Sequence, residues 1–280
     1  MKSQSLAQMF TAFAFGALVS VMAAEPVLAE SASFDQALDQ ALQGDHRDPA
    51  NRERDKYRHP KETLQFFGLR PDMTVVEISP GRGWYTEILA PVLRDRGKLY
   101  AVGFGPARPG LPEYAIKMQT AFEAKLKARP QFYDQVVLTS MQNPKQADFA
   151  PPGTADMVLT FRNVHNWIAD GTADDMFKAM YRALKTGGTL GVVEHRAKPG
   201  TLPEEIKKSG YVTEDHVVAL AEKAGFKLAD RSEINANPKD TKDHPKGVWT
   251  LPPNLRMGDQ DRERYVAIGE SDRMTLKFIK

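Results

Sequence analysis

The 280-residue chain contains no cysteine. Disulfide bonds and metal sites built on thiolates are therefore excluded. Stability has to come from an ordinary buried core. Apolar residues make up 41% of the chain, which is enough to build one. The length fits one sizeable domain or two small ones.

A strong excess of charge of either sign is also absent. The chain has 38 Lys and Arg against 36 Asp and Glu, for a formal net charge of +2. Such a composition gives no reason to expect nucleic acid as a partner.

Long apolar runs are missing from the chain except at its start. Met9–Ala24 is almost wholly apolar but shorter than the roughly 20 residues of a membrane span. Lys2 is the only charge before it, and small residues at Val27–Ala29 follow at the spacing of a cleavage site. We predict a signal peptide over residues 1–29, with an uncleaved anchor as the alternative. The mature protein would be periplasmic or secreted, with no stable membrane span after cleavage.

From Met73 onward, strand-like and helix-like patterns alternate. Strands are predicted at Thr74–Ile78, Leu99–Phe104, Gln135–Thr139, Met157–Phe161, Thr189–Glu194, Lys227–Ile234 and Met274–Ile279. Helices are predicted at Tyr85–Arg94, Pro112–Arg129, Ala173–Leu184 and Thr213–Ala224, with Thr186–Gly188 and Gly225 ending the last two. This alternation predicts an α/β domain whose mostly parallel sheet is covered on both faces.

Two segments interrupt the alternation, so the single domain of residues 30–280 has two additions. Residues 30–72 form an N-terminal helical or cap segment that includes the arginine-rich stretch "DHRDPANRERDKYRHP". Residues 235–273 form an insertion before the last strand. Both ends of that insertion are expected at the carboxyl edge of the sheet, where it would act as a lid or substrate wall.

The stretch "VVEISPGRGWYTE" at residues 75–87 joins a strand to a helix through a small-residue turn. The P-loop is excluded because no Gly-Lys-Ser/Thr ending follows. The dinucleotide fingerprint is incomplete because Thr86 stands where its third glycine belongs. What remains is an acid followed by small residues at every second position, Glu77, Ser79, Gly81 and Gly83.

This pattern resembles the first motif of class I S-adenosylmethionine-dependent methyltransferases. "ADMVLTFRNVHNW", "ALKTGGTLGVVEHRA" and "LAEKAGFKLAD" resemble later segments of the same family. With the exported start, "EISPGRGWYTEILAP", "FRNVHNW" and "GESDRMTLKF" resemble a bacterial family of predicted exported methyltransferases. The resemblance implies a Rossmann-like class I methyltransferase fold with a mostly parallel seven-stranded sheet and helices on both faces.

The resemblance also implies S-adenosyl-L-methionine as the cofactor and a small molecule or envelope component as the substrate. The arginines Arg52, Arg54 and Arg58 would form a basic rim for the substrate if it is anionic. The expected cofactor-binding residues are Glu77, near the methionyl end, with Ser79, Gly81, Gly83, Trp84, Tyr85, Thr86 and Gly103. Two of these depart from the family pattern. Ser79 replaces a glycine, and Gly103 stands where an acid normally binds the ribose. Ribose recognition then comes from elsewhere, or affinity is weak, or the ligand differs.

The candidate catalytic residues are His165, Asn163 and His195. The two histidines follow neighbouring strands of the expected sheet, so both would flank a substrate, and an imidazole suits a general base near neutral pH. Either could instead brace loops, and no third ligand is evident for a shared metal. Two other functions stay open: an exported ligand-binding protein or pseudoenzyme that retains the fold, and a hydrolase or lyase that uses both histidines.

Overall fold

The computed structural model describes residues 24–143 and 145–280 of the chain. The predicted signal peptide falls mainly on residues 1–23, which lie outside the described residues. The first described element, α1 (Ala24–Gln43), begins just after them. Within the described part of the chain, no helix combines the length and the apolar character needed to cross a membrane.

A seven-stranded sheet forms the centre of the molecule, in the order β3-β2-β1-β4-β5-β7-β6. Strands β1 (Thr74–Ile78), β2 (Lys98–Gly103), β3 (Val136–Ser140), β4 (Ala155–Phe161) and β5 (Leu184–His195) run parallel to one another. Strand β7 (Arg273–Ile279) lies antiparallel between β5 and β6 (Lys227–Ser232). The mostly parallel, seven-stranded prediction is therefore confirmed.

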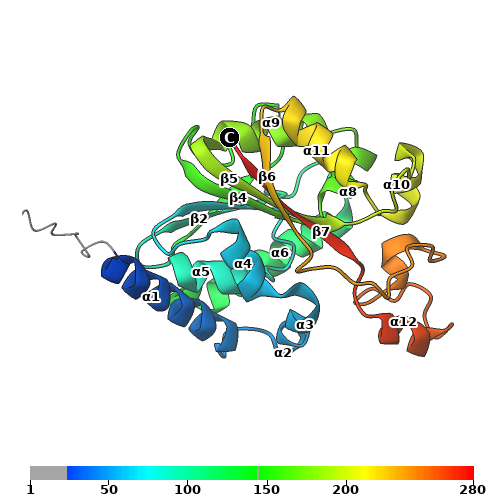
Figure 1. The fold of residues 1–280 in the computed structure, drawn as a ribbon, viewed down its shortest axis with the longest axis horizontal. Helices are drawn as coiled ribbons and strands as arrows, with labels where there is room; N and C mark the ends of the chain where they lie inside the picture. Colours follow the sequence, from blue (N-terminus) through cyan, green and yellow to red (C-terminus); the bar gives the residue numbers. More distant parts are fainter. Residues whose placement is uncertain (1–23, 144) are drawn as a thin grey trace, which may run out of the picture.

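Helices cover both faces of the sheet (Figure 1). One layer contains α1, α4 (Pro60–Phe67), α5 (Thr86–Leu93), α6 (Glu113–Ala128) and α7 (Pro130–Tyr133). The other contains α8 (Val164–Ala169), α9 (Ala173–Ala183), α10 (Pro203–Ser209) and α11 (Glu214–Lys223). Short α2 (Pro49–Arg52) and α3 (Asp55–Arg58) follow α1, and η1 (Gly247–Thr250) and α12 (Arg262–Ile268) lie in the insertion.

The two cores follow from side-chain alternation along the strands. Val75 and Leu99 face the layer of α1, α4 and α5, whereas Val76 and Val102 face the layer of α8 and α9. Strands β1 and β2 thus contribute to both cores, which is why these segments are apolar on consecutive positions.

One predicted helix end is wrong. Thr186–Gly188 does not terminate α9, which ends at Ala183, because β5 has already begun at Leu184. Pairing with β4 is irregular between Ala155 and Met157 and resumes at Thr189. Gly187, with a φ of +77°, therefore lies in the irregular start of the strand.

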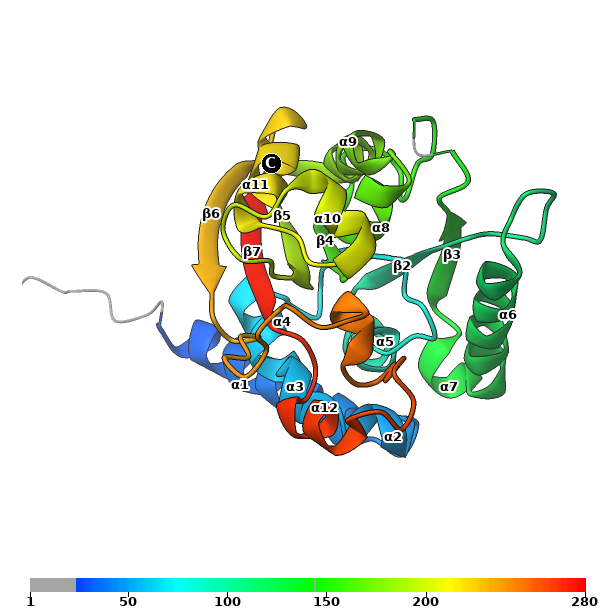
Figure 2. The same ribbon diagram turned by 90° about the vertical axis from the view of Figure 1, so that its right-hand side faces the viewer.

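The strand order reverses between β1 and β4, the neighbours from which the two halves of the sheet extend in opposite directions. In open α/β sheets the carboxyl ends of strands at such a point are where ligands bind. The same edge receives both ends of the 235–273 insertion, as Figure 2 shows from the side of α12. This edge is the place to look for a site.

Candidate active site

The turn after β1 is bent by left-handed backbone at alternate positions. The φ angles are +52° at Ser79, +63° at Gly81 and +81° at Gly83. Glycine adopts such angles without steric cost, and serine only with strain. Ser79 N donates to Val102 O at 2.9 Å, which ties the turn to β2. The replacement of glycine by Ser79 therefore leaves the shape of the turn intact.

Glu77 is a buried acid at the foot of this turn. Its side chain accepts a hydrogen bond from Thr86 Oγ1 at 2.6 Å, and the residue is only 2% exposed. Burial raises the pKa of Glu77 to about 7, although the Thr86 hydrogen bond acts in the opposite direction. Thr86, at the position of the missing third glycine, thus positions the acid that the sequence pattern singled out.

Side chains of α6 lie over the turn. Met118 Sδ would be 3.8 Å from a Cβ at Gly81, and the Phe122 ring would be 2.9 Å from one at Gly83. The absence of a side chain at Gly83 therefore serves packing against α6. Between the turn and α6 remains a hollow of about 180 Å³, whose lining includes Ser79, Gly81 and Met118.

Gly103, at the end of β2, faces Gln119 of α6. A Cβ at this position would overlap Gln119 Oε1. The Gln119 carboxamide is buried, accepts from Phe104 N at 3.0 Å and donates to Glu123 Oε1 at 3.0 Å. An amide therefore occupies the space beside Gly103 where an acid was expected, and it lines the same hollow.

Trp84 and Tyr85 are buried, at 6% and 3% exposure. Trp84 Nε1 donates to Asn51 O at 3.0 Å, and the Tyr85 ring stacks on Phe161 with 3.5 Å between ring centroids. Both rings thus lie in the core beneath the N-terminal segment, and the hollow has no lining from either.

The histidines meet at the ends of β4 and β5, as their positions predicted. The ring centroids of His165 and His195 lie 5.2 Å apart. His165 Nδ1 donates to Glu194 Oε1 at 3.0 Å, and the backbone N–H groups of His165 and His195 donate to the same carboxylate at 3.2 and 2.7 Å. With Nδ1 bonded to Glu194, Nε2 of His165 carries the free lone pair, the arrangement of a general base oriented by a carboxylate.

His195 is partly exposed, and its Nδ1 lies 2.5 Å from Ser271 Oγ. Burial, then the neighbouring His165 and the arginines Arg273, Arg162 and Arg58, hold the pKa of His195 well below its usual value. The imidazole of His195 is therefore neutral at pH 7 and suits a hydrogen-bonding role.

Asn163 lies between the turn and the histidines. Its Nδ2 donates to Ile78 O at 3.0 Å and to Thr160 Oγ1 at 3.1 Å, so it ties the end of β4 to the end of β1. Both amide hydrogens are engaged in these bonds. Its contribution to a site is to hold the two strand ends together.

The insertion covers the histidines. Trp249 of η1 packs edge-on against His165, with 6.1 Å between ring centroids, and Arg256 Cζ lies 4.7 Å above the Trp249 ring. Past α12, Ser271 contacts His195. The segment expected to form a wall or lid thus touches both candidate catalytic histidines.

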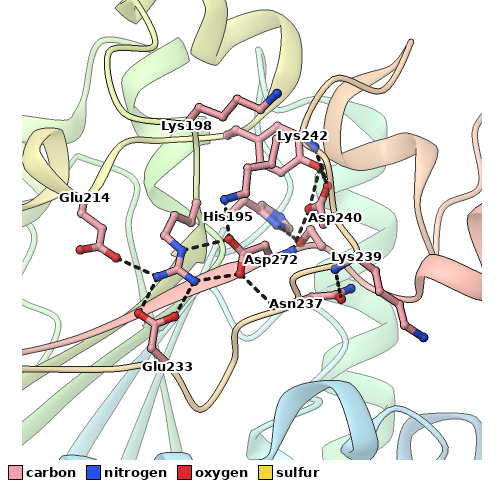
Figure 3. A network of polar contacts seen from close by, with 12 residues as sticks. His195, Lys198, Glu214, Glu233, Asn237, Lys239, Asp240, Lys242 and Asp272 are labelled. Atoms are coloured by element: carbon pink, nitrogen blue, oxygen red, sulfur yellow. Dashed lines mark hydrogen bonds and ion pairs between the residues drawn. The ribbon is translucent and has the colours of Figure 1, made fainter.

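A polar network fixes this segment beside β5 (Figure 3). Asp272 accepts from Arg196 Nε at 2.9 Å and pairs with Lys242 at 2.7 Å, while its backbone N–H donates to Asp240. Asp240 in turn accepts from Tyr211 Oη at 2.9 Å. The network anchors Asp272 and thereby fixes the positions of its chain neighbours Ser271 and Arg273.

His165, Glu194 and His195 also form a possible metal-ligand set, with one potential ligand atom from each within 4.8 Å of the others. Glu194 supplies the third ligand that the sequence did not reveal. However, three arginines are near enough to lower the pKa of His195, and this positive field opposes a cation. We therefore interpret the three residues as a proton-transfer group.

Sequence reasoning missed Glu194 and Gln119. Glu194 directly follows the apolar run of residues 190–193 in β5, and an acid at the end of such a run was the available signal. Gln119 carried no signal, because nothing in an amphipathic helix indicates which polar residue faces a distant glycine.

No family model and no curated protein matches the sequence. Solved structures do. A putative sarcosine dimethylglycine methyltransferase from Galdieria sulphuraria is similar over 80% of this chain and 84% of its own, with 12% identity and a TM-score of 0.54. Phosphoethanolamine N-methyltransferase 2 from Haemonchus contortus, in complex with S-adenosyl-L-methionine, matches over 93% and 60%, with 16% identity and a TM-score of 0.54.

The cyclase SpnF matches over 85% of both chains, with 14% identity and a TM-score of 0.57. At these identities the likeness establishes the fold, which is Rossmann-like and of the class I methyltransferase type. Since the neighbours include a protein named as a cyclase, the fold leaves the reaction open.

Proposed function

We propose that this protein transfers a methyl group from S-adenosyl-L-methionine to a small molecule or envelope component outside the cytoplasm. The observation that carries the proposal is the sharply bent turn over the buried acid Glu77, at the edge where the strand order reverses. Export rests on the sequence of residues 1–29. The narrower assignment to a family of exported bacterial methyltransferases rests on the quoted motifs.

The residues around the turn fit the donor. S-adenosyl-L-methionine carries positive charge at its sulfonium and amino groups, and an ionised Glu77 complements a cation in a buried place. Ser79 and Gly81 would border it through the backbone, and the Gln119 amide, beside Gly103, would serve the hydroxyls for which an acid is lacking. When bound, the donor supplies an electrophilic methyl group.

The chain's own residues contribute proton transfer and alignment. His165 Nε2 accepts the proton of a substrate hydroxyl or ammonium group, and Glu194 stabilises the imidazolium that forms. Neutral His195 orients the substrate by hydrogen bonding. Alignment of the attacking atom contributes several kcal/mol in reactions of this kind, about 7–11 at the upper end.

A ligand-binding protein or pseudoenzyme is the second candidate, and one observation favours it. Met118, Gln119 and Phe122 of α6 lie over the turn and leave only a narrow hollow beside it. Donor binding then requires α6 to move.

The test is calorimetric titration of the mature chain, from Glu30, with S-adenosyl-L-methionine and with its demethylated product. Radiolabelled donor is then incubated with the protein and a host envelope extract. Binding with transfer of label supports the enzyme, and binding without transfer supports the second candidate. Absence of binding would refute both roles for the turn.

A further inference from the structure

Four arginines converge on one carboxylate beside the histidines. Arg54 Nε donates to Glu270 Oε1 at 2.6 Å, and Arg58 Nε donates to Glu270 Oε2 at 3.1 Å. Arg273 pairs with the same oxygen, Oε2. The field of Arg162 also reaches Glu270. Arg58, Glu270 and Arg273 are only 2–3% exposed, so most of this charge is out of water.

The cluster has an excess of positive charge. Four guanidinium groups and one carboxylate leave a net charge of about +3. Arg58 Nη1 and Arg273 Nε are buried donors without a hydrogen-bond partner among the described residues. Arg162 forms no ion pair in the same part of the chain. Buried charge without a counter-charge is costly, so this arrangement is one that a second anion would stabilise.

The titration behaviour of the arginines agrees with a shortage of negative charge. Burial, followed by repulsion from Arg273, lowers the pKa of Arg162 to about 10. Burial and then Arg162 lower the pKa of Arg58 well below its usual value. Burial alone would raise the pKa of Glu270, but the arginines outweigh it and hold that pKa far below the usual range.

The guanidinium groups are held in place before any ligand arrives. Arg58 Cζ lies 4.5 Å above the centre of the Trp84 ring, a cation–π contact that fixes its plane. Arg273 Nη1 donates to Tyr57 O at 3.1 Å. Arg162, partly exposed, has a φ of +62° stabilised by its N–H bond to Val193 O at 2.7 Å. Left-handed backbone at a residue other than glycine costs free energy, and such residues cluster at binding and active sites.

The cluster adjoins the histidines. Arg162 precedes Asn163 and His165 in the chain, and Arg273 is the register partner of His195 across β5 and β7. Arg273, Arg162 and Arg58 also act on the pKa of His195, in that order. An anion held by these arginines therefore lies next to the proposed base.

We propose that Arg58, Arg162 and Arg273 form an oxyanion subsite that holds a carboxylate or phosphate group of the substrate. The statement that the anion belongs to a substrate rests on the proposed function. The anion site itself does not depend on methyl transfer. Arg162 is the entry residue because it is partly exposed and unpaired, whereas Arg58 and Arg273 form the buried floor. Glu270 sets the spacing of the guanidinium groups and leaves the net positive charge.

The test uses Arg162→Asn, because asparagine tolerates left-handed backbone and removes the guanidinium without adding strain. Arg52→Asn is the matched control. The sequence grouped Arg52 with Arg54 and Arg58, but the structure leaves it exposed in α2, without a contact to the cluster among the described residues. Inorganic phosphate and acetate are titrated separately into each protein by calorimetry, in chloride buffer of constant ionic strength. Phosphate binding that exceeds acetate binding identifies a phosphate group, and the reverse identifies a carboxylate.

We expect wild-type and Arg52→Asn proteins to bind the preferred anion equally and Arg162→Asn to bind it about ten- to a hundredfold more weakly. Arg162→Lys, which retains charge but not the planar fork, should fall between them and remains informative if Arg162→Asn does not fold. Failure of the wild type to bind either anion, or equal losses in the Arg52 and Arg162 variants, would overturn the subsite.

Donor titration of the same proteins separates the two proposals. Anion binding without donor binding leaves the subsite standing and removes the methyl-transfer function. Donor binding with transfer of label, but no effect of the Arg162 variants on anion affinity or on the KM for substrate, leaves the function standing and removes the subsite.

Discussion

Replacement of Glu77 by glutamine should remove a pH-dependent loss of stability. Burial raises the pKa of Glu77 from 4.5 to about 7, a difference of about 2.5. One pKa unit corresponds to about 1.36 kcal/mol, so ionisation of the buried acid costs about 3 kcal/mol. Glutamine has the same shape and can still accept the hydrogen bond from Thr86, but it has no charge to bury.

The sign follows from proton binding. Between pH 4.5 and about 7 the folded state keeps the proton of Glu77, whereas the unfolded state has lost it. The contribution of this group to stability is therefore fully present at low pH and is lost as pH rises through about 7. Wild-type protein should lose about 3 kcal/mol that Glu77→Gln retains.

Urea unfolding of both proteins at intervals from pH 4 to pH 8 measures the effect. The stability of Glu77→Gln minus that of wild type should grow by about 3 kcal/mol across this range, because contributions from other groups cancel. A difference that stays constant would refute the reasoning, since it would mean that Glu77 has the same pKa in the folded and unfolded states and that the Thr86 hydrogen bond offsets burial.

The donor provides a second measurement on the same pair. If a cationic donor binds only the ionised form of Glu77, its apparent affinity for wild type should rise about tenfold between pH 6 and pH 8, following the fraction ionised. Glu77→Gln should show no such rise. Equal pH profiles for the two proteins would place the donor away from Glu77.

Three further predictions concern the turn, the ribose position and the base. Gly81→Val should abolish donor binding while the far-UV spectrum stays that of folded protein, because valine strains a φ of +63°, and unchanged affinity in calorimetry would remove the turn from the site. Gly103→Asp should weaken donor binding and destabilise the fold by about 1–3 kcal/mol, because the new side chain displaces Gln119 from Phe104 N. The double variant with Gln119→Ala should recover most of the stability in urea unfolding, and a double variant no more stable than the single one would contradict this. His165→Asn should reduce turnover about a hundred- to ten-thousandfold with donor affinity nearly unchanged, whereas loss of thermal stability with an unaltered pH profile of the remaining rate would make His165 a brace.

The central strands β1, β2 and β4 were predictable because they are buried on both faces. Val75 packs in one core and Val76 in the other, so both positions are apolar. A continuous apolar run bounded by turn residues predicts such a strand without tertiary information. The prediction at Thr186–Gly188 was wrong because it considered only local sequence, in which two glycines usually end a helix. In the structure, pairing with β4 extends β5 back to Leu184, so these residues lie in the strand.

The candidate site was predictable only where topology alone decides proximity. His165 and His195 had to meet, because the strands before them are neighbours. The roles of Glu194 and Gln119 depend on where side chains point across elements, and no periodicity specifies that. The arginine-rich segment gave a basic signal, but not that Arg58 would be buried beside Arg273.

The arginine cluster joins two segments that lie far apart in the sequence. Arg54 and Glu270 are 216 residues apart in sequence, as are Arg273 Nη1 and its acceptor Tyr57 O. Contacts at such separation carry the entropic cost of closing a long loop. Until β7 has docked between β5 and β6, Arg58 lacks both Glu270 and Arg273 as neighbours. Completion of the sheet by β7 is therefore the step that assembles the proposed anion subsite.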